Sequence, residues 1–290
     1  MKHLGAIEGG GTWFHAAVGL SDGTLLETTT IPTTTPAATV AAVADFFAAH
    51  CIEAVGVGCF GPLSLNPGAE DFGCIRDTPK PGWSGFNVRG ALSAALGVPV
   101  RLQTDVIAAA IGEHRFGAGR GIESLVYLTV GTGIGGGSLV NGEPVSSRLH
   151  AEMGHFRAAR QPDDPFSGVC PFHGDCLEGM AAGPAIAARW GVPGEQLPAG
   201  HDAWDLTGRI LADGLRTILA VLAPDRVILG GGVGGNPALW PPLLAHLLSG
   251  IAGYWPAVVP EDWLVPPGLG TRSALVGGLV MAVAEARDVR

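Results

Sequence analysis

Three glycine-rich turns, each directly following a short apolar run, constrain the fold of this 290-residue chain most strongly. The runs LGAIE, SLVYLTV and RVIL have the length and composition of buried β-strands. They lead into glycine turns at residues 9–12, 131–136 and 230–232. Because glycine has no Cβ, such turns let the backbone approach another group closely. We therefore expect an α/β protein whose strands end in turns of this kind.

A strand–glycine turn–strand unit occurs at residues 4–20 and again at 125–140. This similarity indicates a weak internal duplication that covers the two hairpins only. Apolar residues recur at helical spacing in several segments between and after the hairpins. The expected helices cover residues 36–50, 106–117, 183–190, 205–222 and 271–286. Residues 65–90 are expected to form a loop, and residues 150–180 an irregular segment.

The composition excludes several classes of protein. Nearly half of the residues are hydrophobic (47%) and 15% are charged, so the chain can bury a sizeable core and is not expected to be disordered. The net charge is −9 and the 17 basic residues form no cluster, which argues against a nucleic-acid partner. No signal peptide is visible, and the apolar run 274–284 is too short and too glycine-interrupted to span a membrane. We expect a cytoplasmic protein that binds neither nucleic acid nor membrane.

The glycine turns are candidate phosphate sites. Backbone N–H groups in such turns can hold phosphate oxygens without interference from side chains. The alternative is that hairpins need glycine in any case. Three turns, two of them in similar hairpins, favour phosphate binding. The sequence has no GxxxxGK[ST] motif, so the chain is not a P-loop protein.

Two cysteines and a histidine, Cys170, His173 and Cys176, follow one another at intervals of three residues. Zinc prefers four thiolate or imidazole ligands in a tetrahedron, and His155 is a nearby fourth candidate. The alternatives are an incidental grouping in a glycine-rich loop and a Cys170–Cys176 disulfide. An odd total of five cysteines argues mildly against a disulfide framework. We expect the other three cysteines to act as small buried apolar residues: Cys51, Cys59 and Cys74.

Three carboxylates are candidates for chemistry. Asp105 ends the expected strand VRLQTD and precedes a helix, which is where open α/β sheets bind ligands. It is either a general base for a hydroxyl nucleophile or a plain helix N-cap. Glu152 and Glu178 lie within three residues of expected zinc ligands, so a metal would hold them in place to bind a ligand with many hydroxyl groups. The alternative is that both are ordinary solvated surface acids.

Taken together and in order, the motifs resemble those of the ROK family of sugar kinases, within the actin-like ATPase superfamily. EGGGT and LTVGTGIGGG resemble the two phosphate loops of that family, and QTDVIAAA its catalytic aspartate motif. HAEMGH and CPFHGDCLEG resemble its sugar-binding and zinc motifs, and VILGGGV its adenosine loop. TPKPGW at residues 78–83 and the C-x2-H-x2-C spacing are most similar to bacterial fructokinases of the family.

The resemblance implies a fold of two α/β domains with an interdomain cleft. Residues 1–115 and the closing helix 272–290 would form the small domain, and residues 116–271 the large domain with the zinc-binding loop. It implies an ATP-dependent kinase that transfers the γ-phosphate to the 6-hydroxyl of D-fructose, and a homodimer. The alternatives are a kinase for mannose, glucose or an N-acyl hexosamine, and a non-catalytic sugar sensor. Some family members are repressors with an N-terminal helix-turn-helix region, but too few residues precede the first glycine turn for one here.

The resemblance also implies roles for individual residues. Asp105 would be the catalytic base, ATP would bring Mg²⁺, and the Zn²⁺ would be structural. The ATP-binding residues would be Gly10, Gly11, Thr12, Gly131, Thr132, Gly133, Pro184, Gly230, Gly231 and Gly232. The sugar-binding residues would be Glu152, His155 and Glu178. The zinc ligands would be His155, Cys170, His173 and Cys176.

Four positions depart from the family pattern. Glu8 stands where an aspartate is usual and Trp13 where a lysine is usual. Thr104 and Ile107 occupy positions where asparagine is common. A glutamate can still act near Mg²⁺, whereas Trp13 removes a cation that could neutralise phosphate. These departures affect the expected sugar and phosphate contacts rather than the class of reaction.

Overall fold

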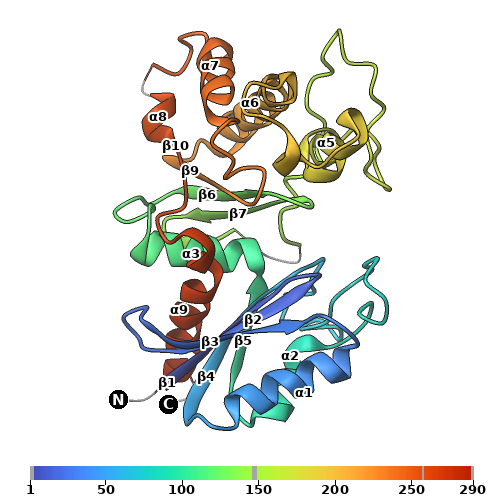
Figure 1. Cartoon of the computed structure of the whole chain (residues 1–290). Coiled ribbons are helices and arrows are strands. Elements are labelled where there is room, and N and C mark those ends of the chain that lie inside the picture. The colour runs from blue at the N-terminus through green and yellow to red at the C-terminus, as the bar shows by residue number, and fades with distance from the viewer. Residues whose placement is uncertain (1–2, 146–148, 257, 289–290) are drawn as a thin grey trace. The chain divides into compact units, whose positions relative to one another are not determined.

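The computed structural model describes residues 3–145, 149–256 and 258–288, which form two α/β units (Figure 1). The first unit combines residues up to 121 with 137–151 and 268 onward, and the second combines 122–136 with 152–267. The sequence-based division at 115/116 and 271/272 did not place residues 137–151 in the first unit. They lie there because Gly137 packs against the start of a helix of that unit, where a Cβ would come within 2.7 Å of the Val106 backbone.

The first unit contains a five-stranded sheet with the order β3-β2-β1-β4-β5. Strands β1, β4 and β5 are parallel, whereas β2 and β3 are antiparallel neighbours. The strands are β1 (His3–Gly9), β2 (Trp13–Gly19), β3 (Leu25–Pro32), β4 (Ile52–Cys59) and β5 (Val100–Thr104). The helices of this unit are α1 (Pro36–Phe47), α2 (Val88–Leu96), α3 (Asp105–Phe116) and α9 (Ser273–Asp288), with a short 3-10 turn η2 (Gly270–Arg272).

Alternation along the strands separates the two faces of this sheet. Ile7 in β1 packs in the core that includes α1 and α2, whereas Ala6 packs in the core that includes Leu279 of α9. The face toward α9 is built from small residues. At its centre, a Cβ on Gly56 of β4 would lie 2.0 Å from the carbonyl oxygen of Gly278 in α9. Glycine at this point therefore allows the helix backbone to lie directly on the sheet.

The second unit is built around the sheet β10-β9-β6-β7-β8. The strands β6 (Leu125–Val130), β9 (Arg226–Gly230) and β10 (Leu264–Val265) belong to this unit. The strand β7 (Ile134–Val140) begins in it and ends in the first unit, to which β8 (Glu143–Pro144) belongs. The helices of the second unit are α4 (Leu177–Ala181), α5 (Gly183–Trp190), α6 (Asp202–Leu222), α7 (Trp240–Ile251) and α8 (Pro260–Trp263), with a short 3-10 turn η1 (Gly194–Gln196). Leu128 of β6, Leu229 of β9 and Leu215 of α6 belong to one buried core.

The structure corrects several expectations about individual elements. The loop expected at residues 65–90 ends earlier, because α2 begins at Val88. The irregular segment expected at residues 150–180 also ends earlier, because α4 begins at Leu177. The helix expected from residue 205 begins at Asp202, because the His201 side chain accepts a hydrogen bond from the Ala203 N–H and caps it there. The helix α7 was not predicted, although its prolines 241 and 242 suit a first helical turn. Within the described residues, no helix combines the length and apolar character needed to cross a membrane.

A buried carboxylate joins the end of α3 to the start of α9. Glu113 is fully buried, and its Oε2 accepts hydrogen bonds from the N–H groups of Ala118 (2.7 Å) and Gly268 (2.9 Å). Its Oε1 accepts from the N–H of Leu269 (2.9 Å) and from the hydroxyl of Ser273 (2.6 Å). These four donors offset the cost of burying the carboxylate. Glu113 therefore ties the helix that begins at Asp105 to the segment that leads into α9.

We expect Glu113→Ala to destabilise the first unit strongly. The change would leave one buried and three part-buried donors without their acceptor, and an unsatisfied buried donor costs about 1–3 kcal/mol. The urea midpoint and the melting temperature should fall by the equivalent of at least about 3 kcal/mol. The exposed Glu123→Ala is the matched control and should leave both values unchanged. Equal melting of the two variants would show that these hydrogen bonds contribute little.

Candidate functional site

The first sheet ends in a row of functional groups. Because β1, β4 and β5 are parallel, with Gly9, Cys59 and Thr104 paired across them, their carboxyl ends lie at one edge. This edge carries Glu8, Cys59 and Asp105, and the first glycine turn starts from it. In open α/β sheets ligands bind at the carboxyl ends of the strands. The edge is therefore the candidate catalytic part of the first unit.

Asp105 is the first residue of α3, and it is not the N-cap. That role belongs to Thr104, whose side-chain oxygen accepts a hydrogen bond from the N–H of Ile107 (3.3 Å). The strand thus ends one residue earlier than expected, and the N-cap alternative for Asp105 is wrong. Asparagine and threonine are both good N-cap residues, so a threonine in place of the expected asparagine keeps a capping side chain at this position. The Asp105 Oδ1 accepts from the N–H of Val106 (2.9 Å), which orients the carboxylate at the helix N-terminus.

The acidic groups at this edge disfavour one another's ionised forms. Burial, and then the negative charge of Asp105, raise the pKa of Glu8 to about 7. Burial, and then the same charge, also raise the pKa of the Cys59 thiol well above its usual value. An opposite charge nearby favours the ionised form of a carboxyl group. Glu8 and Asp105 therefore form a pair whose environment suits a bound cation.

The first glycine turn is held by the residue that follows β3. The Thr33 hydroxyl donates to the Gly10 carbonyl (2.8 Å), and the Thr33 N–H donates to the Thr12 carbonyl (2.9 Å). Gly11 and Thr12 are exposed, and the Trp13 side chain is 47% exposed. The three predicted phosphate residues Gly10, Gly11 and Thr12 thus form a fixed turn with an accessible backbone.

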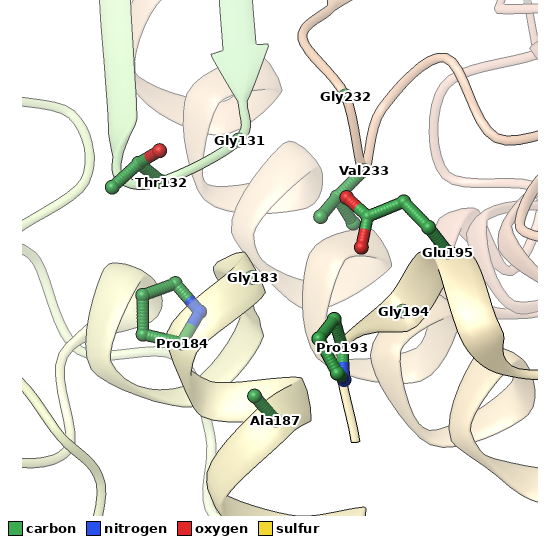
Figure 2. A pocket seen from close by; sticks show the side chains of 10 residues that line it. All are labelled: Gly131, Thr132, Gly183, Pro184, Ala187, Pro193, Gly194, Glu195, Gly232 and Val233. Carbon is green, nitrogen blue, oxygen red and sulfur yellow. The ribbon is translucent and has the colours of Figure 1, made fainter. Parts of the chain in front are cut away.

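A cavity of about 350 Å³ in the second unit brings together four of the predicted nucleotide residues, Gly131, Thr132, Pro184 and Gly232 (Figure 2). Three other predicted residues, Gly133, Gly230 and Gly231, are not part of its lining. The remaining lining residues are Gly183, Ala187, Pro193, Gly194, Glu195 and Val233. No glycine turn or motif in the sequence marks the segment 193–195, so its place in the lining could not be predicted.

Hydrogen bonds between loops shape this cavity. The Gly183 N–H, at the start of α5, donates to the Gly131 carbonyl (2.8 Å), and the Val233 N–H donates to the Val130 carbonyl (2.9 Å). Gly231 has a φ of +87°, and a Cβ there would lie 2.3 Å from the Val130 carbonyl oxygen. Gly231 therefore shapes the third turn, while its neighbour Gly232 lines the cavity. The second and third glycine turns thus line the cavity with backbone, whereas the N–H groups of Gly183, Ala185 and Ile186 at the start of α5 are bonded within the fold.

The four predicted zinc ligands converge. Their ligand atoms all lie within 4.8 Å of one another. The His155 Nδ1 lies 3.8 Å from the Cys170 Sγ, 3.7 Å from the Cys176 Sγ and 3.3 Å from the His173 Nδ1. Zn–S bonds of about 2.3 Å and Zn–N bonds of about 2.1 Å in a tetrahedron place S and N about 3.6 Å apart, and N and N about 3.4 Å apart. The four residues therefore fit a tetrahedral metal ion.

The thiols of this cluster also point to a cation. Cys170 and Cys176 are both buried and free, so the disulfide alternative is wrong. Burial, and next the neighbouring Cys170, raise the pKa of the Cys176 thiol to about 11. Two buried thiolates side by side need a compensating positive charge, which a coordinated metal provides.

The predicted sugar residues lie around this cluster. The N–H of Glu178 in α4 donates to the Gly154 carbonyl (2.8 Å), which ties α4 to the HAEMGH segment. The Glu178 Oε2 accepts from the N–H of Ile134 (2.9 Å) at the end of the second glycine turn. Glu152 is exposed and begins the turn closed by the bond from the His155 N–H to its carbonyl (3.0 Å). Glu178 is thus held by both the HAEMGH segment and the second glycine turn.

A sequence model of the ROK family matches residues 4–285 of this chain. The chain belongs to the ROK family. A fructokinase from Pediococcus pentosaceus is 39% identical to it over 285 residues, which cover 98% of this chain and 99% of the relative. The match thus extends over both units and includes every candidate site residue.

Solved structures of ROK proteins have the same fold. A ROK hexokinase from Thermus thermophilus has a TM-score of 0.77 and 30% identity, with 99% of each chain covered. A ROK glucokinase from Streptomyces griseus, solved with glucose and AMPPNP, has a TM-score of 0.78 and 25% identity, with 97% of this chain and 99% of that chain covered. The predicted fold class, the two-domain actin-like ATPase fold, is confirmed.

The raised pKa of Glu8 predicts a specific dependence of stability on pH. Since the pKa rises from 4.5 to about 7 on folding, Glu8 stabilises the fold most below pH 4.5, and this contribution is lost as the pH rises through 7. In magnesium-free buffer, the free energy of unfolding should therefore fall by about 2–3 kcal/mol more between pH 5 and pH 8 in the wild type than in Glu8→Gln. Urea unfolding at the two pH values measures this difference. Identical pH profiles for the two proteins would contradict the placement of Glu8.

The metal cluster predicts that Cys176→Ser releases the metal. Loss of one of four ligands should remove bound zinc, measured by inductively coupled plasma mass spectrometry, and lower the melting temperature by several degrees because metal binding is coupled to folding. Cys51→Ser is the matched control, since Cys51 is an exposed free thiol outside the cluster, and the expectation that it is buried is wrong. Full metal content with normal melting in Cys176→Ser would refute the ligand assignment.

Proposed function

We propose that this protein is an ATP-dependent fructokinase that transfers the γ-phosphate of ATP to the 6-hydroxyl of D-fructose. The observation that carries the proposal is the 39% identity to a fructokinase over 98% of this chain and 99% of that relative. The identity to the hexokinase and the glucokinase of known structure is lower, at 30% and 25%. The geometry of the candidate site residues in each of the two units is consistent with this reaction.

Asp105 is the proposed general base. In the reaction, the oxygen of the sugar hydroxyl bonds to the γ-phosphorus, the bond from that phosphorus to the β–γ bridging oxygen breaks, and ADP leaves. The proton of the hydroxyl passes to the Asp105 carboxylate, which the bond from the Val106 N–H holds in position. Catalysis of this type depends on positioning and charge neutralisation more than on covalent chemistry.

The phosphates are proposed to bind to the glycine turns of each unit. Gly10, Gly11 and Thr12 offer an accessible backbone in the first unit, and Gly131, Thr132 and Gly133 do so in the second. Mg²⁺ that accompanies ATP supplies neutralisation of the phosphate charge. Glu8 would hold that ion directly or through water, because its carboxyl group already lies in a negative environment that a cation would relieve. Pro184 and the turn Gly230–Gly232 would contact the nucleoside.

The sugar hydroxyls are proposed to bind Glu152, His155 and Glu178. The proposed zinc site explains how a segment with little regular structure can orient them. With His155, Cys170, His173 and Cys176 all as ligands, a tetrahedral Zn²⁺ has no open position for water and is structural. The Nδ1 of His155 faces the other ligands, which leaves the opposite nitrogen of its ring for a sugar hydroxyl.

We further propose that the protein acts in the cytoplasm as a homodimer. Its use of ATP and its reduced cysteines suit that compartment. The dimer follows from the resemblance to its family. Light scattering after gel filtration should give twice the mass of one chain, and the mass of a single chain would overturn the dimer.

The function is tested by ADP release from metal-replete protein with Mg²⁺ and ATP over fructose, mannose, glucose and N-acetylglucosamine. We expect strong turnover on fructose. A higher kcat/KM for another sugar would overturn the assigned substrate, and no turnover on any of them would overturn the kinase.

In the same assay, Asp105→Asn should lower kcat by at least about a hundredfold with ATP affinity retained, because the proton acceptor is lost. Asp45→Asn, on the exposed face of α1, is the matched control and should be fully active. Normal turnover by Asp105→Asn would remove Asp105 from the role of general base.

A further inference from the structure

The lining of the nucleotide cavity contains one acidic side chain that no motif explains. Of the ten described residues that line it, Thr132 and Glu195 carry polar side chains. Thr132 belongs to the second glycine turn, where phosphate is proposed to bind. Glu195 lies on the opposite side of the cavity, beside Val233, and its carboxylate points inward (Figure 2). Glu195 is thus the side-chain acceptor on the side away from the phosphate turn.

The backbone holds Glu195 in this position. It is the middle residue of η1, where the Gln196 N–H donates to the Pro193 carbonyl and the Leu197 N–H to the Gly194 carbonyl, both at 3.0 Å. Gly194 is buried, and a Cβ there would lie 3.3 Å from the ring of Trp204 in α6. The turn therefore packs closely on α6, which places the backbone of Glu195 at the cavity, while its side chain is exposed and free to meet a ligand there.

The chemistry of the lining restricts what Glu195 can bind. A carboxylate accepts hydrogen bonds but donates none, and it repels phosphate groups. Its partner must therefore be a hydrogen-bond donor or a cation, and an uncharged part of a nucleotide meets this condition through its N–H and O–H groups. Pro184, Ala187, Pro193 and Val233 form apolar walls that suit the faces of a flat base. A nucleoside then offers two adjacent ribose hydroxyls, which match the two oxygens of one carboxylate, as with the acidic residue that binds ribose in dinucleotide folds.

We propose that Glu195 binds the ribose hydroxyls of the nucleotide and sets the preference of this enzyme for ribonucleotides over deoxyribonucleotides. The inference rests on the proposed binding of ATP in this cavity. It assigns to Glu195 a part in nucleotide affinity and none in the chemical step, because the residue lies on the side of the cavity away from the phosphate turn. Removing it should therefore change KM for ATP and leave kcat at saturating ATP unaffected.

The test compares wild type, Glu195→Ala and Glu195→Gln. Gln196→Ala is the matched control, an exposed neighbour outside the lining. Affinity by calorimetry and KM with fructose are measured for ATP, 2′-deoxy-ATP, 3′-deoxy-ATP and purine riboside triphosphate, which lacks the 6-amino group. Wild type should bind ATP about tenfold more tightly than either deoxy analogue, the value of a hydrogen bond to a charged group. Glu195→Ala should bind ATP and the two deoxy analogues about equally, with kcat within about twofold of wild type. The preference of Glu195→Gln for ATP over the deoxy analogues should lie between those of wild type and Glu195→Ala.

Each contrary result has a distinct meaning. Unchanged ATP affinity in Glu195→Ala would overturn the proposal. If that variant still discriminated against the deoxy analogues but no longer against purine riboside triphosphate, Glu195 would bind the base amino group, and the ribose assignment would be wrong. Absence of ATP binding by the wild type would overturn the proposed function together with this inference. Normal ATP turnover by the wild type, together with unchanged ATP affinity and KM in the Glu195 variants, would overturn the inference alone.

Discussion

The parallel pairing of β1, β4 and β5 is the constraint on which the first unit depends. It aligns three strand ends at one edge, so that Glu8, Cys59 and Asp105 lie together although nearly a hundred residues separate the first from the last. The helix α9 packs closely on one face of the sheet at Gly56 and supports this pairing. On the other face, the larger side chains of β1 and β4 pack against α1 and α2. The electrostatic result is a glutamate whose pKa is raised to about 7 by burial and by Asp105.

In the second unit, the organising interactions are those that hold irregular segments in place. Residues 152–176 have little regular structure, and backbone hydrogen bonds to α4 hold them where His155, Cys170, His173 and Cys176 converge. Glu178 connects this segment to the second glycine turn through the Ile134 N–H. A hydrogen bond within this unit therefore connects a residue proposed to bind the sugar with the turn proposed to bind phosphate. The proposed structural metal would order such a segment in place of an apolar core.

The strongest local patterns predicted their structures well. The helix at residues 183–190, the long helix that ends at Leu222, the closing helix and the strands before each glycine turn all form where the apolar periodicity indicated. The misses have physical reasons. The helix α7 starts with two prolines, which a simple reading takes as breakers although they suit a first turn, and α2 starts at the end of a proline-rich stretch. The inclusion of residues 137–151 in the first unit depends on how closely β7 passes α3 at Gly137, which no local pattern encodes.

The sequence by itself determined the chemistry available to this protein: the four candidate metal ligands, the aspartate that follows β5 and the glycine turns. These signals are readable because each depends on residue type and on short spacing along the chain. The tertiary structure alone decided which groups meet. It assigned the N-cap to Thr104 instead of Asp105, brought Gly131, Thr132, Pro184 and Gly232 to one cavity, and placed Glu195 in its lining. The physical reason is that these contacts join residues far apart in the chain, and their partners are selected by the packing of strands and helices rather than by neighbouring residues.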